Sequence, residues 1–129
     1  MIHKSLYLVV ASLLIFNCAS KKVEENLDQE MIICTMQFVS IPVEIKGETI
    51  DELYLINNQT KEKKVLKKNH QSFYTLIDDS SKNTLKNKEI EYTLIGKHKT
   101  QKVIEEPYIL GADACHVYKK SGKDIIVLN

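Results

Sequence analysis

Alternating apolar and polar residues, in short runs separated by turn-forming residues, fill most of the chain after residue 31. The clearest run lies at residues 89–94, where Ile90, Tyr92 and Leu94 alternate with polar side chains. Strict alternation puts successive side chains on opposite faces of a β-strand, one face buried and one exposed. No stretch of this region has the spacing of an amphipathic helix. The pattern predicts an all-β fold, a β-sandwich of about seven antiparallel strands.

The predicted strands lie within residues 32–45, 53–56, 65–66, 73–77, 90–94, 102–105, 115–119 and 125–128. Within the first strand the apolar residues change parity near Val39. This predicts a β-bulge or a change of sheet, because a slip of one residue turns every side chain to the other face. Pro107 is expected to end the sixth strand, since proline cannot donate to a ladder. Ser121 and Gly122 are expected to turn the last two strands into a hairpin. The lysine-rich strand at 65–66 is expected at a sheet edge.

The first 17 residues follow a different pattern, that of an export signal. A short basic start with His3 and Lys4 precedes residues 6–16, which are almost wholly apolar, and a single cysteine, Cys18, closes the run. This is the order of parts in a secretory signal peptide. A helix that crosses a bilayer needs about 20 apolar residues, so we expect the segment to direct export and to be removed.

The tripeptide before Cys18, Ile15-Phe16-Asn17, resembles the lipobox of bacterial lipoproteins. The resemblance implies that Cys18 carries palmitate or similar acyl chains and becomes the first residue of the mature protein; ordinary secretion is the alternative. Residues 20–30 contain only Val23 and Leu27 as apolar residues, which predicts a solvated tether. The expected division is a signal peptide at residues 1–17, a lipidated cysteine and flexible tether at 18–31, and one β-sandwich domain at 32–129.

The charge balance argues against a nucleic-acid partner. The chain has 18 basic and 17 acidic residues, and removal of Lys4 with the signal leaves no net charge. Every basic residue is a lysine; arginine, which is best suited to bidentate contacts with phosphates and bases, is absent. We expect the membrane as a partner, through the lipid on Cys18, and an envelope protein or a small ligand as a further partner.

Two cysteines remain when Cys18 carries lipid. Cys34 falls in the first predicted strand and Cys115 in the next-to-last. An even pair in a compartment that permits oxidation predicts a disulfide. Two alternatives stay open: separate buried thiols, and a metal site of Cys34, Cys115 and His116 with Asp113 as fourth ligand. The metal site has a geometric weakness, because adjacent residues of one strand point to opposite faces.

Sequence motifs for enzyme chemistry are missing. The chain has no Gly-x-Ser-x-Gly elbow, no phosphate-binding glycine loop and no His-Glu-x-x-His pair. The cluster Asp78-Asp79-Ser80-Ser81 offers oxygen ligands to a hard cation but lacks the spacing of a calcium loop, so turn capping is favoured. We expect no enzymatic activity and no cofactor.

Two motifs resemble a family of small, uncharacterised lipoproteins of Bacteroidota: Ile33-Cys34-Thr35-Met36-Gln37-Phe38, and Gly111-Ala112-Asp113-Ala114-Cys115-His116-Val117-Tyr118. Those proteins are similar to the prealbumin-like modules called carboxypeptidase regulatory-like domains. The resemblance therefore implies an immunoglobulin-like or prealbumin-like sandwich from Cys34 to the C-terminus. In that family two adjacent cysteines precede the histidine of the second motif. Here Ala114 replaces the first of them, which leaves Cys115 as the single candidate partner for Cys34.

These features together predict a lipid-anchored β-sandwich module of the cell envelope. The resemblance implies a location, that of an outer-membrane lipoprotein that faces the periplasm or the cell surface, but it implies no activity. The expected role is binding or structural. The alternative is a metal-binding or redox accessory lipoprotein that uses Cys34, Cys115 and His116.

Overall fold

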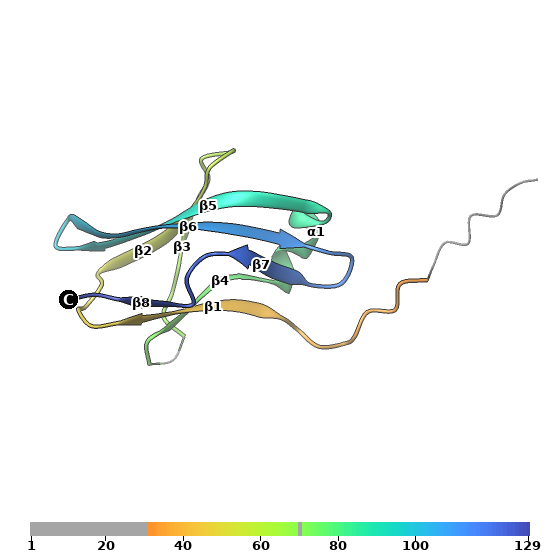
Figure 1. Cartoon of the computed structure of the whole chain (residues 1–129), viewed down its shortest axis with the longest axis horizontal. Helices are drawn as coiled ribbons and strands as arrows, with labels where there is room; N and C mark the ends of the chain where they lie inside the picture. Colours follow the sequence, from red (N-terminus) through yellow and green to blue (C-terminus); the bar gives the residue numbers. More distant parts are fainter. Residues whose placement is uncertain (1–30, 70) are drawn as a thin grey trace, which may run out of the picture. The chain divides into compact units, whose positions relative to one another are not determined.

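A computed structural model describes residues 31–69 and 71–129 of the chain. The predicted signal peptide and all but the last residue of the predicted tether lie outside these residues. The described part folds mainly into strands, which form two layers (Figure 1). The elements are β1 (Ser40–Lys46), β2 (Glu52–Asn57), β3 (Lys63–Val65), β4 (Phe73–Asp78), the 3-10 helix η2 (Asp79–Ser81), the short helix α1 (Lys82–Leu85), β5 (Lys88–His98), β6 (Gln101–Ala112), β7 (Val117–Ser121) and β8 (Ile125–Val127).

The strands form one sheet in the order β4-β1-β8 and a second in the order β3-β2-β5-β6-β7. The all-β sandwich predicted from the alternating pattern is thus confirmed. The lysine-rich strand β3 lies at an edge of the larger sheet, as expected. Neighbouring strands are antiparallel except β1 and β8, which run parallel. None of the helices in the described residues is long and apolar enough to cross a membrane.

The core lies between the two sheets and is closed at one end by α1. Ile90 and Leu94, which mark the predicted alternation in β5, are 8% and 0% exposed. Leu85 brings the single turn of α1 into the same core. Burying side chains of this size contributes about 1.5–3 kcal/mol each. The largest side chains with less than 2% of their surface exposed are Val43, Leu55, Leu76, Leu85, Leu94, Tyr108 and Leu110.

The first strand is shorter than predicted. Residues 32–39 form no strand, and β1 begins only at Ser40. The apolar side chains at residues 31–38 are therefore exposed, Val39 and Ile41 pack against the core from its margin, and the first fully buried side chain of the described residues is Val43. The predicted irregularity exists but lies later, between Ile41 and Pro42 in the pairing with β4. The earlier apolar residues have the composition of a strand but no neighbouring strand to pair with.

Two predictions about the C-terminal half were wrong. Pro107 does not end a strand: β6 runs through it, with Thr93 of β5 as its partner. The other neighbour, β7, pairs with β6 only from Ile109 onward, so Pro107 faces an unpaired edge where a missing N–H costs little. The last two strands form no hairpin either. The chain turns at Gly122, and β8 crosses to the other sheet to pair with β1.

Candidate functional site

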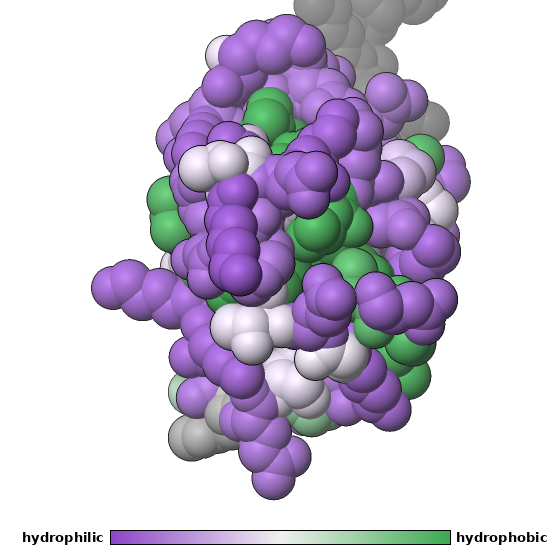
Figure 2. Space-filling model, turned by 90° about the vertical axis from the view of Figure 1, so that its left-hand side faces the viewer, coloured by the Kyte–Doolittle hydropathy of each residue, from purple (hydrophilic) through white to green (hydrophobic). Residues whose placement is uncertain are grey.

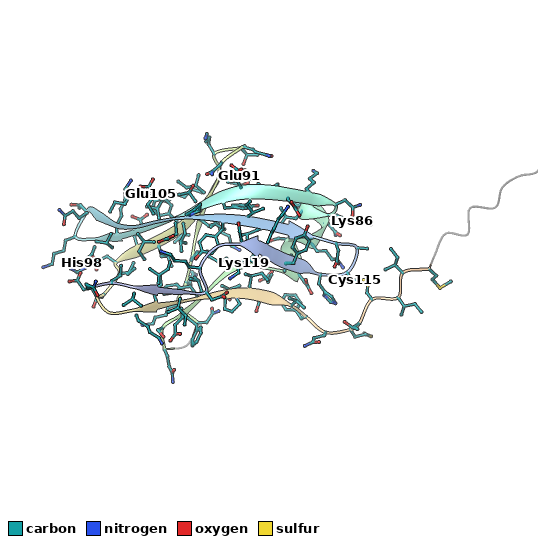
Figure 3. All side chains as sticks on the ribbon, in the orientation of Figure 1. Lys86, Glu91, His98, Glu105, Cys115 and Lys119 are labelled. Atoms are coloured by element: carbon teal, nitrogen blue, oxygen red, sulfur yellow. A yellow bond between two sulfur atoms is a disulfide. The ribbon has the colours of Figure 1, made fainter. Side chains whose placement is uncertain are left out.

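The sequence-predicted site residues meet at one end of the sandwich, where residues 34–39, here called the strap, lie against the loop between β6 and β7. Cys34 of the strap and Cys115 of the loop form a disulfide with sulfur atoms 2.04 Å apart. Neither cysteine lies in a strand, contrary to expectation. Figure 3 shows Cys115 at the end of the domain where residues 31–39 meet it.

The loop between β6 and β7 is shaped by Asp113. One carboxylate oxygen, Oδ1, accepts hydrogen bonds from the backbone N–H groups of Cys115 and His116, over 2.7 and 2.8 Å. The Asp113 N–H donates in turn to the His116 carbonyl. These N–H donors favour the charged carboxylate, and the bonds from His116 and Cys115 lower the pKa of Asp113. The aspartate thereby fixes the direction of both Cys115 and His116.

A second aspartate, Asp79, joins the strap to the body of the domain. Its Oδ2 accepts a 2.8 Å hydrogen bond from the N–H of Val39, and its Oδ1 accepts a 2.9 Å bond from the N–H of Val117. Oδ2 also lies 2.8 Å from Nδ1 of His116. The side chain is 10% exposed. Burial alone would raise its pKa, but the bonds from Val39, His116 and Val117 outweigh burial and hold the pKa at about 2.

His116 links Asp79 to Thr35 of the strap. An ionised carboxylate only accepts, so Nδ1 carries the proton that it donates to Asp79. The other ring nitrogen, Nε2, lies 2.9 Å from the Thr35 hydroxyl and, in the neutral ring, accepts its hydrogen bond. The strap is thus held at three successive points, by the disulfide at Cys34, the histidine at Thr35 and the carboxylate at Val39.

The order carboxylate, imidazole, hydroxyl is also the order in which hydrolases activate a nucleophile. Such chemistry further needs N–H groups directed at a developing oxyanion. The N–H groups that flank the ring do not serve this purpose, because those of Cys115 and His116 donate to Asp113 and that of Val117 donates to Asp79. The arrangement is suited to fastening the strap.

The four residues of the alternative metal site lie close together but do not fit a metal ion. Zinc is bound by thiolates, whereas Cys34 and Cys115 are bonded to each other. Both ring nitrogens of His116 already have partners, and Asp113 is occupied with the loop backbone. Over residues 31–69 and 71–129, no group of three or more His, Cys, Asp or Glu side chains is arranged to hold a metal.

The sequence alone points to the cysteines, His116 and Asp113 but not to Thr35 or to the role of Asp79. The turn capping expected of residues 78–81 is confirmed at Asp78, whose Oδ1 accepts a hydrogen bond from the N–H of Ser80 over 2.9 Å. Asp79 instead turns toward His116, 37 residues away in the sequence. The only sequence signal for this contact is the presence of two adjacent aspartates, one more than the cap requires.

Three hollows open on the described surface. One, of about 300 Å³, lies over the strap, Asp79 and His116. A second, of about 230 Å³, opens between Leu55, Ile77 and Tyr92. The third, of about 460 Å³, lies at the opposite end of β1, beside residues 45–50. Figure 2 views that end and shows apolar side chains among polar ones.

Comparisons with protein-family models, with curated proteins and with solved structures give no match for this chain. The resemblance to the Bacteroidota lipoproteins therefore stays an expectation from the two sequence motifs. The geometry at this end of the sandwich, in which an extended segment is fastened by one covalent and two hydrogen-bonded links, is the observation from which a function is inferred.

Proposed function

We propose that this protein is a lipid-anchored module of the bacterial cell envelope, tethered through acyl chains on Cys18 and acting as a binding or structural β-sandwich. The observation that carries the proposal is the disulfide between Cys34 and Cys115. Disulfides persist in the periplasm and at the cell surface and are rare in the cytosol of mesophiles. The export signal that precedes Cys18 supplies a route to such a compartment.

The surface charges support a module without a strongly charged partner. Four lysines on the larger sheet and its connections pair with glutamates, and the proposed mature chain has no net charge, so it has little overall field to attract a polyanion. Exposed pairs of this kind contribute only about 0–1 kcal/mol each to stability, so their main effect is to balance the surface. The pairs are Lys63–Glu52, Lys102–Glu105, Lys120–Glu89 and Lys123–Glu106.

Metabolic labelling with an alkyne-bearing palmitate tests the anchor. The wild-type protein should take up the label and sediment with membranes. Cys18→Ser should lose the label and appear in the soluble fraction, because one or more acyl chains supply the membrane affinity. The matched control is Cys34→Ser/Cys115→Ser, which removes the other two cysteines and should keep both label and membrane association. A Cys18→Ser protein that stays labelled, or that sediments with membranes as completely as the wild type, would refute the proposed anchor.

Mass spectrometry of the purified protein distinguishes the metal-binding or redox alternative from the proposed disulfide-bonded module. Under denaturing, non-reducing conditions an oxidised pair takes up no thiol reagent, and the intact mass is unchanged. Labelled Cys34 and Cys115 together with released zinc would favour the metal-binding alternative instead.

A further inference from the structure

The strap region presents large apolar side chains to solvent. Four of them lie within residues 32–38, and each has well over half of its surface exposed: Ile32 (64%), Ile33 (85%), Met36 (103%) and Phe38 (66%). We call these four side chains the apolar strip. Single exposed apolar residues are ordinary, but a contiguous set of them marks an interaction surface.

The strip is held in place rather than left loose. The links at Cys34 and Thr35 precede Met36 and Phe38, and the link at Val39 follows them, so the backbone that carries these two side chains is fixed at both ends. Ile32 and Ile33 lie directly before the first link. The other large apolar residues exposed on the described domain are scattered over its strands: Val65, Phe73, Ile125 and Val127. A fastened segment whose apolar side chains face water is explained most simply by a partner that covers them.

The sequence that precedes the strip is poorly suited to cover it. Residues 20–30 are mostly charged, with Val23 and Leu27 as their only apolar members, and residues 1–17 are cleaved in the proposed mature form. The strip is also too small to serve as the interface with a second copy of the chain. At ~150 Å² per side chain, four side chains offer about 600 Å², below the ~800 Å² per partner of a standard protein interface.

The position of the strip in the chain favours a bilayer. Ile32 follows the proposed lipid attachment site, Cys18, by 14 residues. The solvated tether expected from the sequence of residues 18–31 would have a root-mean-square span of about 20 Å, which would hold the strip at an effective concentration of order millimolar near the membrane. Weak intrinsic affinity is then sufficient. Aliphatic and phenyl side chains are those that insert at the boundary between headgroups and acyl chains.

Resting on the proposed lipid anchor, we infer that the apolar strip inserts into the surface of the same bilayer and so sets the orientation of the domain. Charges at this end of the sandwich are mixed. Figure 3 places Lys86 and Cys115 at the same end of the domain, and acidic and basic residues lie side by side here: Lys82, Lys86 and Lys88 with Asp78, Asp79, Glu89 and Asp113. The contact is therefore apolar in character and should persist at high salt.

Tryptophan fluorescence tests the inference, because the chain contains no tryptophan of its own. Phe38→Trp places a single reporter in the strip. Val65→Trp, in β3, is the matched control at an apolar residue of similar exposure, 59%. Both are made in the chain from residue 18, with the Cys18 thiol coupled to a maleimide lipid in the vesicles, which keeps every described core residue and supplies the tether without lipidation in cells. The probe is vesicles of phosphatidylcholine with a minority of phosphatidylglycerol, with and without bromine on the acyl chains.

The expected result is that brominated vesicles quench the Phe38→Trp emission by about half and quench Val65→Trp by less than about a tenth, as expected for a side chain at the acyl boundary. Adding Ile33→Asn/Met36→Asn should abolish the quenching while thiol reagents still find no free cysteine. Absence of quenching, or equal quenching at both positions, overturns the inference. A blue shift of the Phe38→Trp emission that depends on protein concentration without vesicles overturns it in favour of a second copy. None of these results depends on whether Cys18 is acylated in cells.

Discussion

Removing the disulfide gives the sharpest test of how the strap is held. The substitution Cys34→Ser/Cys115→Ser eliminates the bond without leaving a free thiol in the domain. Cys34 lies before the first strand, and the core of the described domain begins at Val43. The variant should therefore fold to the same sandwich, and its loss of stability should come from chain entropy and not from lost packing.

The size of the loss can be bounded from the structure. The bond joins residues 81 apart. Closing such a loop in the unfolded chain costs about 4.5 kcal/mol of entropy, which is the expected loss if the strap stays in place without the bond. If the strap becomes loose in the folded variant, the bond in the folded state closes a loop of only five residues, between Val39 and Cys34. The entropy of closing this short loop must then be subtracted from that of closing the long loop in the unfolded chain. The loss then falls to about 2.5 kcal/mol, from (3/2)RT times the logarithm of the ratio of loop lengths.

Urea unfolding, followed by circular dichroism, measures the difference. With a slope of ~1.5 kcal/mol per molar, the midpoint should fall by about 1.5–3 M. The wild-type protein in the presence of a reductant should give the same midpoint as the variant. A value near the upper bound means that His116 and Asp79 hold the strap unaided. A loss below about 1 kcal/mol would refute the reasoning, because the folded state would then restrain Cys34 no better than the unfolded chain does.

Three further outcomes are expected. The pKa of Asp79 is lowered to about 2, so its carboxylate stabilises the fold fully above about pH 4, and this stabilisation is lost as the pH falls toward 2. The difference in urea midpoint between wild type and Asp79→Asn should therefore shrink between about pH 4 and about pH 2. A constant difference would contradict the assignment. Gly122 has φ +123°, and a Cβ there would overlap the Tyr108 ring. Gly122→Ala should therefore cost ~2 kcal/mol or more in chemical denaturation, whereas Ser121→Ala, at an exposed strand end, should cost under ~0.5. Tyr108→Phe removes the 2.8 Å bond that the phenol donates to the Lys123 carbonyl and should cost ~1 kcal/mol; no change in the midpoint would show that water replaces the bond.

The strands of the larger sheet could largely be predicted from local pattern. Ile90 and Leu94 alternate with polar residues and are buried as expected, because a half-buried strand has apolar residues on its inner face and polar residues on its outer face. The lysines beside Val65 likewise marked an edge. The alternation and the lysine-rich edge are each properties of a single strand, so they can be recognised from a short stretch of sequence.

Properties that depend on neighbours could not be predicted in this way. Residues 32–38 have the apolar content of a strand, but none of the described strands pairs with them. Pro107 is tolerated within β6 because β7 begins to pair only at Ile109, a fact of tertiary arrangement. Gly122 correctly marked a turn, but no local signal shows that the following strand changes sheet to pair with β1.

Of the candidate site, only the disulfide could be predicted from the sequence. Counting cysteines is enough to propose a bond between Cys34 and Cys115 when a leader implies export. The partnership of Asp79 with His116 and of His116 with Thr35 joins residues 37 and 81 positions apart through side chains of common types. Many such pairs can be drawn in any chain, and only the fold selects one.

The site of the sulfur bond also decides how the domain carries a mechanical load. A pull on the chain ahead of Cys34 passes through the sulfurs to Cys115 and from there into β6 and β7, two strands of the larger sheet. It bypasses β1, whose ladders with β4 and β8 would otherwise be peeled open from Ser40. Drag from the surroundings would thus be borne by the five-stranded layer, and reduction of one bond would redirect the same force onto the three-stranded layer.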